Sequence, residues 1–122
     1  MDELIARLVA NVGVDRVAAE KAIGIILDFL IKEGPSDKVQ TLIDKLPGAA
    51  ALLQAQQAGD AGSGMFSMGG LMGAGTKMMG AGLSMGQVQG VTKEVIAYSR
   101  EKAGEDVIGE IVGAIPGLSQ FV

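Results

Sequence analysis

The chain contains no histidine and no cysteine among its 122 residues. It therefore lacks the commonest general base, the thiol nucleophile, and the nitrogen and sulfur ligands of metal sites. It also forms no disulfide, so nothing in it requires an oxidising compartment. We expect a protein that is not an enzyme, binds no cofactor and holds no metal.

Aromatic residues are also scarce, with three phenylalanines, one tyrosine and no tryptophan. Because 48% of the residues are nonetheless hydrophobic, the core must consist of aliphatic side chains and methionine. The shortage of strand-favouring aromatic residues favours an all-α fold. The length suits a single domain, residues 1–122, that buries roughly two-thirds of the surface exposed by its unfolded chain.

Positive charge is both limited and dispersed, since the ten lysines and arginines are scattered singly and the net charge is −4. Binding to a phosphate backbone requires clustered basic residues, so we expect no nucleic-acid partner. The opening residues Met1-Asp2-Glu3-Leu4 lack the basic start and long apolar run of a secretory signal. We expect a cytoplasmic protein without a transmembrane segment.

The second half of the chain repeats the first at an offset of 69 residues. Leu46-Pro47-Gly48 recurs as Ile115-Pro116-Gly117, and Gly13-Val14 recurs as Gly82-Leu83. The apolar positions that match in kind are Ala22 and Val91, Ile26 and Val95, Leu27 and Ile96, Phe29 and Tyr98, Val39 and Ile108, Leu42 and Ile111, and Ile43 and Val112. The duplication predicts six to eight helices in two pseudo-symmetric tandem units, residues 1–58 and 82–122, joined by a Gly/Met-rich segment, residues 59–81.

Helix boundaries in the first unit follow from capping and turn residues. Asp2 is placed to cap a first helix that ends at Gly13, and Asp15 is placed to cap a second that stops at Gly34-Pro35. Ser36 is a candidate cap for a third helix, and residues 49–57 form a fourth. The apolar stripe of the first helix is Leu4, Ile5, Leu8, Val9 and Val12, and that of the third is Val39, Leu42, Ile43 and Leu46.

The long second helix has only a narrow polar stripe, made of Arg16, Glu20, Asp28 and Lys32 and passing through Gly24. A helix that is exposed to solvent only along so narrow a stripe is predicted to be central in the fold. In the second unit, Ser84 and Gln87 form a capping box, with Leu83 as its hydrophobic staple. Residues Val88, Val91, Val95 and Tyr98 then form the buried stripe of the long helix that follows.

The Gly/Met-rich segment has two opposed interpretations. Eleven glycines fall between Gly59 and Gly90, and glycine costs about 1 kcal/mol per helical position relative to alanine, which is typical of a linker. The repeat instead aligns this segment with the first helix, which predicts a helix over residues 66–81 after a loop at residues 59–64. Gly69 and Gly73 would then allow close approach of another helix.

The methionines of this segment, with two neighbouring apolar residues, are the candidate binding residues of the chain. The candidate residues are Met65, Phe66, Met68, Leu71, Met72, Met78 and Met79. Methionine is flexible enough to fill gaps in a core or to form an adaptable binding surface. We expect an interaction or scaffold domain that self-associates into a homo-oligomer, with an unidentified protein as a further candidate partner. The alternative is a carrier that holds an apolar small molecule or lipid in a Met-lined cavity.

Carboxylates offer the remaining chemistry, with Glu105, Asp106 and Glu110 clustered at the start of one predicted helix. Acidic residues are favoured there by the helix dipole, so we interpret the cluster as structural and not as a cation site. A hydrolase acting through serine or carboxylates is the third hypothesis.

The turn residues and aliphatic runs resemble a known bacterial family. The run from Asn11-Val12-Gly13-Val14 to Leu46-Pro47-Gly48, followed by a Gly/Ser-rich spacer and Gly82-Leu83-Ser84, resembles the family of unknown function named after the VcgC and VcgE proteins. A related small all-helical family of unknown function is a close second. The resemblance implies a helical domain without an established catalytic residue, and it leaves localisation open.

Overall fold

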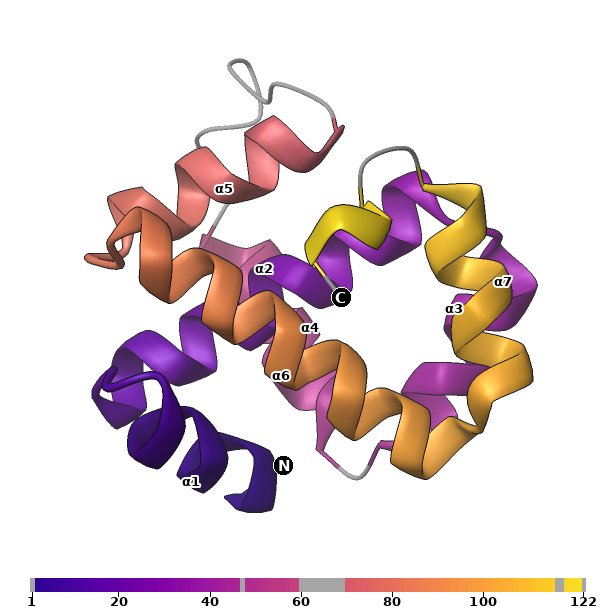
Figure 1. The fold of residues 1–122 in the computed structure, drawn as a ribbon, viewed down its shortest axis with the longest axis horizontal. Helices are drawn as coiled ribbons and strands as arrows, with labels where there is room; N and C mark the ends of the chain where they lie inside the picture. The colour runs from indigo at the N-terminus through magenta and orange to yellow at the C-terminus, as the bar shows by residue number, and fades with distance from the viewer. Residues whose placement is uncertain (1, 47, 60–69, 116–117, 122) are drawn as a thin grey trace.

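The computed structural model describes residues 2–46, 48–59, 70–115 and 118–121, and the side chains of residues 2–46, 48–54, 75–115 and 118–119. Within these ranges the chain forms seven α-helices and one short 3-10 helix, with no strand (Figure 1). The elements are α1 (Asp2–Asn11), α2 (Arg16–Glu33), α3 (Ser36–Lys45), α4 (Ala49–Gly59), α5 (Gly70–Gly80), α6 (Met85–Ala103), α7 (Glu105–Ala114) and η2 (Leu118–Phe121). The predicted all-α fold is confirmed.

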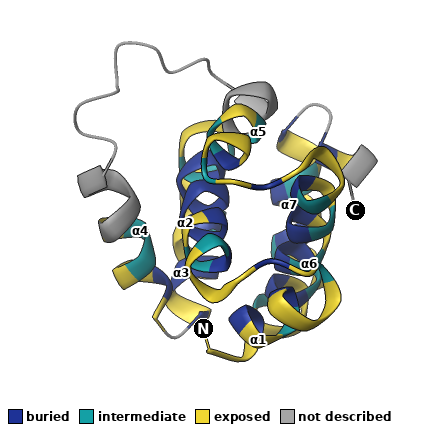
Figure 2. Ribbon diagram, turned by 90° about the vertical axis from the view of Figure 1, so that its left-hand side faces the viewer, coloured by how far each residue is buried: buried dark blue, intermediate teal, exposed yellow. Residues whose placement is uncertain are grey.

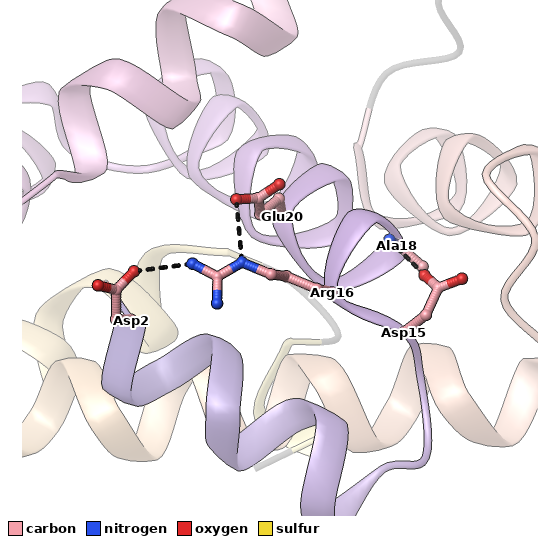
Figure 3. A network of polar contacts seen from close by, with 5 residues as sticks. All are labelled: Asp2, Asp15, Arg16, Ala18 and Glu20. Carbon is pink, nitrogen blue, oxygen red and sulfur yellow. Dashed lines mark hydrogen bonds and ion pairs between the residues drawn. The ribbon is translucent and has the colours of Figure 1, made fainter.

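Glycine turns with capping residues connect the first helices of each half to the long ones. Gly13 has a φ of +85°, and α2 then begins with Asp15 as its N-cap, whose carboxylate accepts a hydrogen bond from the Ala18 amide at 2.8 Å (Figure 3). The prediction that Asp2 is an N-cap is wrong, because Asp2 is itself the first residue of α1. Its carboxylate instead pairs with Arg16 at 3.1 Å, joining α1 to α2.

The start of α3 also differs from the prediction. Pro35 occupies the N-cap position, with extended backbone angles and no side-chain capping bond. The prediction that Ser36 caps this helix is therefore wrong. The turn that follows α3 is as predicted: the Ala49 amide donates to the Leu46 carbonyl at 3.1 Å, and Gly48 has a φ of +85°. This positive φ is what a Pro-Gly turn requires of its glycine.

The boundary between α5 and α6 confirms the predicted capping box. The Ser84 amide donates to the Gln87 side chain at 2.9 Å, and the Gln87 amide donates to the Ser84 hydroxyl at 3.3 Å. Just before it, Gly82 has a φ of +103° and the Leu83 amide donates to the Met78 carbonyl at 3.2 Å. Such a glycine turn satisfies the last carbonyls of α5 before the chain enters α6.

The helices of the two halves pack against each other around one core. Helix α1 contacts both α2 and α6, α5 also contacts both α2 and α6, and α3 lies beside α7 (Figure 1). The buried apolar residues form one cluster, and their faces point inward between α2 and α6 (Figure 2). The predicted core residues Ile26, Phe29, Leu42, Ile43, Val95, Tyr98 and Ile111 are all buried. Val112 is only half-buried, which corrects the prediction for that residue.

Helix α2 is more deeply buried than its sequence indicates. Gly24 and Asp28 lie on the predicted polar stripe, yet both are buried, and Asp28 forms an ion pair with Lys32 at 2.9 Å. Helices α4 and α5 both pack against α2, as do α1, α3 and α6, so neighbours lie on more of its surface than the pattern predicts. Only Arg16, Glu20 and Lys32 keep the stripe in contact with water.

Across the described ranges, no helix has the length and apolar character needed to cross a lipid bilayer.

One buried hydroxyl in α6 provides a stability test. Ser99 is fully buried, and its Oγ has no hydrogen-bond partner in the described part of the chain. An unsatisfied buried polar group costs about 1–3 kcal/mol. We expect Ser99→Ala to raise the free energy of unfolding by about 1 kcal/mol, measured by chemical denaturation.

The matched control for Ser99→Ala is Thr92→Val on the same helix. The Thr92 hydroxyl is also buried but donates to the Val88 carbonyl at 2.9 Å, so its replacement gives no comparable gain. A Ser99→Ala variant that is less stable than the wild type would contradict this interpretation.

Candidate functional site

The structure separates the candidate methionines that it describes. Met78 is 1% exposed and belongs to the core, whereas the adjacent Met79 is 48% exposed. Leu71 and Met72 lie in α5, but their side chains are outside the described set. Met65, Phe66 and Met68 are outside the described residues altogether. Met78 and Met79 therefore do not share one surface.

Helix α5 confirms the helical interpretation of the Gly/Met-rich segment over Gly70–Gly80. Two ends of the prediction are wrong, because Gly59, predicted to start the loop at residues 59–64, is the last residue of α4, and Ala81, predicted to end the helix, lies in the turn after α5. Residues 66–69 of the predicted helix and residues 60–64 of the loop lie outside the described residues. A Cβ built on Gly75 or on Gly80 meets no atom within 4 Å, so neither glycine provides a close helix contact. The packing around Gly69 and Gly73 lies outside the described side chains.

The close approach between helices that the sequence suggested for α5 occurs instead at Gly90 of α6. A Cβ built there would lie 3.2 Å from Cγ2 and 3.3 Å from Cγ1 of Val12. Gly90 therefore makes room for the end of α1 on the surface of α6, an arrangement that any larger residue would disturb.

The large exposed apolar side chains of the described residues all lie close in sequence to one of two turns. They are Val9, Val17, Met79 and Met85, with exposed fractions between 41% and 60%. Each lies within four residues of Gly13 or Gly82. The two turns lie at the left of Figure 1 and face the viewer in Figure 2. We call these four residues the turn surface.

A direct hydrogen bond links the two turns, because Gln87 Nε2 donates to the Gly13 carbonyl at 3.4 Å. Between them lies an open hollow of about 320 Å³, lined by Gly13, Val14, Asp15, Val17, Ala18, Ala81, Gly82 and Gln87. Asp15 and Gln87 are its polar side chains, and both already make capping bonds. Neither Met78 nor Met79 lines the hollow.

The turn surface includes two residues that the sequence analysis did not select, Val17 and Met85. Both sit in the first turn of a long helix, two positions and one position after an N-cap residue. Val9 was predicted to belong to the buried stripe of α1, but it is 41% exposed, which corrects that prediction. The sequence feature that could have identified Val17 and Met85 is an apolar residue close to a helix cap that lies outside the periodic apolar stripe of its helix.

Charged residues elsewhere join helices of different halves. Arg7 of α1 lies 3.0 Å from Glu101 and 3.5 Å from Glu94 of α6, and its guanidinium carbon lies 5.7 Å from the centre of the Tyr98 ring. The hydrogen bond with Glu101 raises the pKa of Arg7 above its usual value. These contacts join α1 to α6.

The acidic residues predicted to cluster at the start of α7 lie in an ion pair and in the first turn of that helix. Glu110 pairs with Lys38 of α3 at 2.9 Å, and this hydrogen bond raises the pKa of Lys38. Glu105 and Asp106 lie in the first turn of α7, where acidic side chains favour the helix dipole. No group of three or more metal-ligating side chains occurs among the described residues.

No protein-family model, no curated protein and no solved structure matches this chain.

Proposed function

We propose that this chain is a non-enzymatic interaction domain of the cytoplasm that self-associates through the turn surface. The observation that supports this proposal most is the position of the large exposed apolar side chains. All four lie within four residues of one of the two turns that Gln87 links. Large apolar side chains exposed beside two turns that touch each other are the feature of the described surface that supports an interaction site.

A second copy of the same chain suits this surface because of its charge. The chain carries a net charge of −4, so two copies repel each other over most of their surface. The turn surface is made of uncharged side chains, and the nearby Arg16 is already paired with Asp2 at 3.1 Å and with Glu20 at 3.9 Å (Figure 3). The apolar side chains of two such patches can meet in a two-fold symmetric dimer, and the Asp15 carboxylate between the turns accepts a hydrogen bond from the Ala18 amide at 2.8 Å.

The alternative function, a carrier of an apolar small molecule or lipid, has less support. It requires methionines around a cavity, but Met78 is packed in the core and Met79 faces solvent. The hollow between the turns is open and is lined by neither of them. The described residues therefore favour the interaction domain.

We also propose that the two halves are structural repeats and that the chain belongs with the VcgC/VcgE-like family. The repeats are supported by boundaries that recur after 69 residues: α3 spans Ser36–Lys45 and α7 spans Glu105–Ala114. The N-caps Asp15 and Ser84 have nearly equal backbone angles, φ/ψ of −80°/170° and −80°/167°. The recurrence of turns and caps, with different charges around them, fits a duplicated scaffold.

Self-association is tested with Met85→Asp, which places a charge on the most exposed apolar side chain of the turn surface. Met85 is 60% exposed, so the substitution should leave the fold intact. Because the new carboxylate would be desolvated in a dimer, we expect the dissociation constant to rise at least about tenfold, measured by sedimentation velocity over a concentration series.

The control is Ala50→Asp, which adds the same charge at an exposed position in the first turn of α4. An acidic residue there favours the helix dipole and lies outside the turn surface, so self-association should be unchanged. Equal sedimentation of Met85→Asp and the wild type at every concentration would contradict the proposal.

A further inference from the structure

Three described methionine side chains lie on either side of the Gly82 turn and differ in their contact with solvent. Met78 and Met79 are in the last turn of α5, and Met85 is the first residue of α6. Met78 is buried in the core, whereas Met79 and Met85 are among the large apolar side chains that are exposed. Solvent therefore reaches two of these three thioethers.

The turn between these methionines is held by groups other than their sulfur atoms. The Gly82 amide donates to the Met79 carbonyl at 3.0 Å, which is a bond between backbone groups. On the other side of the turn, the capping box of Ser84 and Gln87 starts α6. A chemical change at the exposed sulfur atoms therefore leaves these bonds in place and alters the surface.

Oxidation is a reaction open to an exposed thioether. The sulfur of methionine attacks one oxygen of hydrogen peroxide, so that a sulfur–oxygen bond forms as the oxygen–oxygen bond breaks. The sulfur gives up two electrons, and the departing hydroxide takes the proton of the transferred oxygen and leaves as water. The chain has no cysteine, so no thiol competes for the oxidant. The product, methionine sulfoxide, is polar and is reduced again by methionine sulfoxide reductases.

We propose that Met79 and Met85 are sites of reversible oxidation by hydrogen peroxide, and that their sulfoxides prevent two copies from pairing through the turn surface. The two sites are inferred from the exposure of their side chains, whereas the effect on pairing rests on the proposed function. A sulfoxide oxygen would lose its water in the interface, and burying a polar group without a hydrogen-bond partner is unfavourable. Peroxide thus acts on the separate chain and keeps it separate.

The two sites are tested on the full chain with hydrogen peroxide itself. Trypsin cleaves after Lys77 and Lys93, so all three methionines lie on one peptide, residues 78–93, and tandem mass spectrometry locates each added oxygen. We expect Met79 and Met85 to be oxidised at least about tenfold faster than Met78 in the folded chain, because the reaction follows exposure. In urea the three rates should become equal. Equal rates in the folded chain would overturn the assignment of the sites.

The effect on pairing is tested with Met79→Leu/Met85→Leu, a double variant that keeps both positions apolar and removes only their sulfur. Both side chains are exposed and leucine has a similar volume, so the fold and the pairing should match those of the wild type. The variant retains every other methionine, so oxidation elsewhere is the same in both proteins. Circular dichroism at 222 nm checks the fold of both proteins before and after treatment.

The dissociation constants of both proteins are measured by sedimentation velocity before and after treatment with peroxide. We expect oxidation to raise the dissociation constant of the wild type at least about tenfold and to leave that of the double variant unchanged. Methionine sulfoxide reductases should restore pairing of the wild type. An equal loss of pairing in the two proteins would assign the effect to other methionines and overturn the role of Met79 and Met85 in it.

Failure of this inference is distinguishable from failure of the proposed function. A dimer that Met85→Asp disrupts, but that persists with sulfoxides at Met79 and Met85, supports the proposed function and overturns the effect of oxidation on pairing. A wild-type chain that is monomeric before treatment contradicts the proposed function, and the effect on pairing is overturned with it. The relative oxidation rates confirm or overturn the two sites in either case, because they are measured independently of pairing.

Discussion

Ile26→Ala is expected to lower the free energy of unfolding by about 2–5 kcal/mol, through lost transfer energy and the cavity left behind. Ile26 is 2% exposed in the middle of α2, which packs against α1, α3, α4, α5 and α6. Because neighbours surround this helix, the cavity has little room to collapse. Urea denaturation followed by circular dichroism at 222 nm measures the change.

The control for Ile26→Ala is Val17→Ala on the same helix. Val17 is 59% exposed, so its truncation removes few contacts and should change stability by less than about 0.5 kcal/mol. Similar losses in the two variants would mean that the buried face of α2 is wrongly assigned.

Gly34→Ala is expected to cost about 1–3 kcal/mol, as is typical of bulk forced into a packed site. Gly34 has a φ of −94°, so the glycine is not needed for a left-handed conformation. Its role is steric, since a Cβ there would lie 2.7 Å from the Leu30 carbonyl oxygen and 3.1 Å from Cγ2 of Val39. The Gly34 amide also donates to that carbonyl at 2.7 Å, so the backbone has little freedom to move away.

The comparison variant is Gly75→Ala in α5, where a built Cβ meets nothing within 4 Å. Alanine in place of a helical glycine restricts the unfolded chain, so stability should rise by about 0.5–1 kcal/mol. The two Gly-to-Ala changes are thus predicted to have opposite signs in the same thermal or urea unfolding assay. A gain in stability from Gly34→Ala would contradict the steric role of Gly34.

Local chemistry explains what the sequence predicts correctly about the fold. Ser84 and Gln87 satisfy each other's backbone donors, and Gly13 and Gly82 adopt positive φ values that other residues rarely reach. These signals lie within a few residues of each other, so they need no knowledge of the tertiary fold.

Errors occur where distant parts of the chain decide the outcome. Asp2 lies inside α1 as its first residue and pairs with Arg16 of the next helix, and Asp28 is buried in a helix that packs against five others. A periodic pattern shows that a helix has an apolar face, but it does not show how many neighbours pack around it.

The candidate site was predictable only in part, for the same reason. The methionines mark α5 as unusual, yet only packing against α2 and α6 decides that Met78 is buried and Met79 exposed. Val17 and Met85 join the surface because two turns 69 residues apart meet in space, linked by Gln87 and Gly13. Nothing local to either turn encodes that meeting.

Native mass spectrometry of the wild-type chain, purified from cells without denaturation, tests the proposed function most directly. An interaction domain that self-associates predicts a dimer of two 12.4 kDa chains with no added mass. A monomer that carries a co-purified lipid or other apolar molecule would contradict it and favour the carrier.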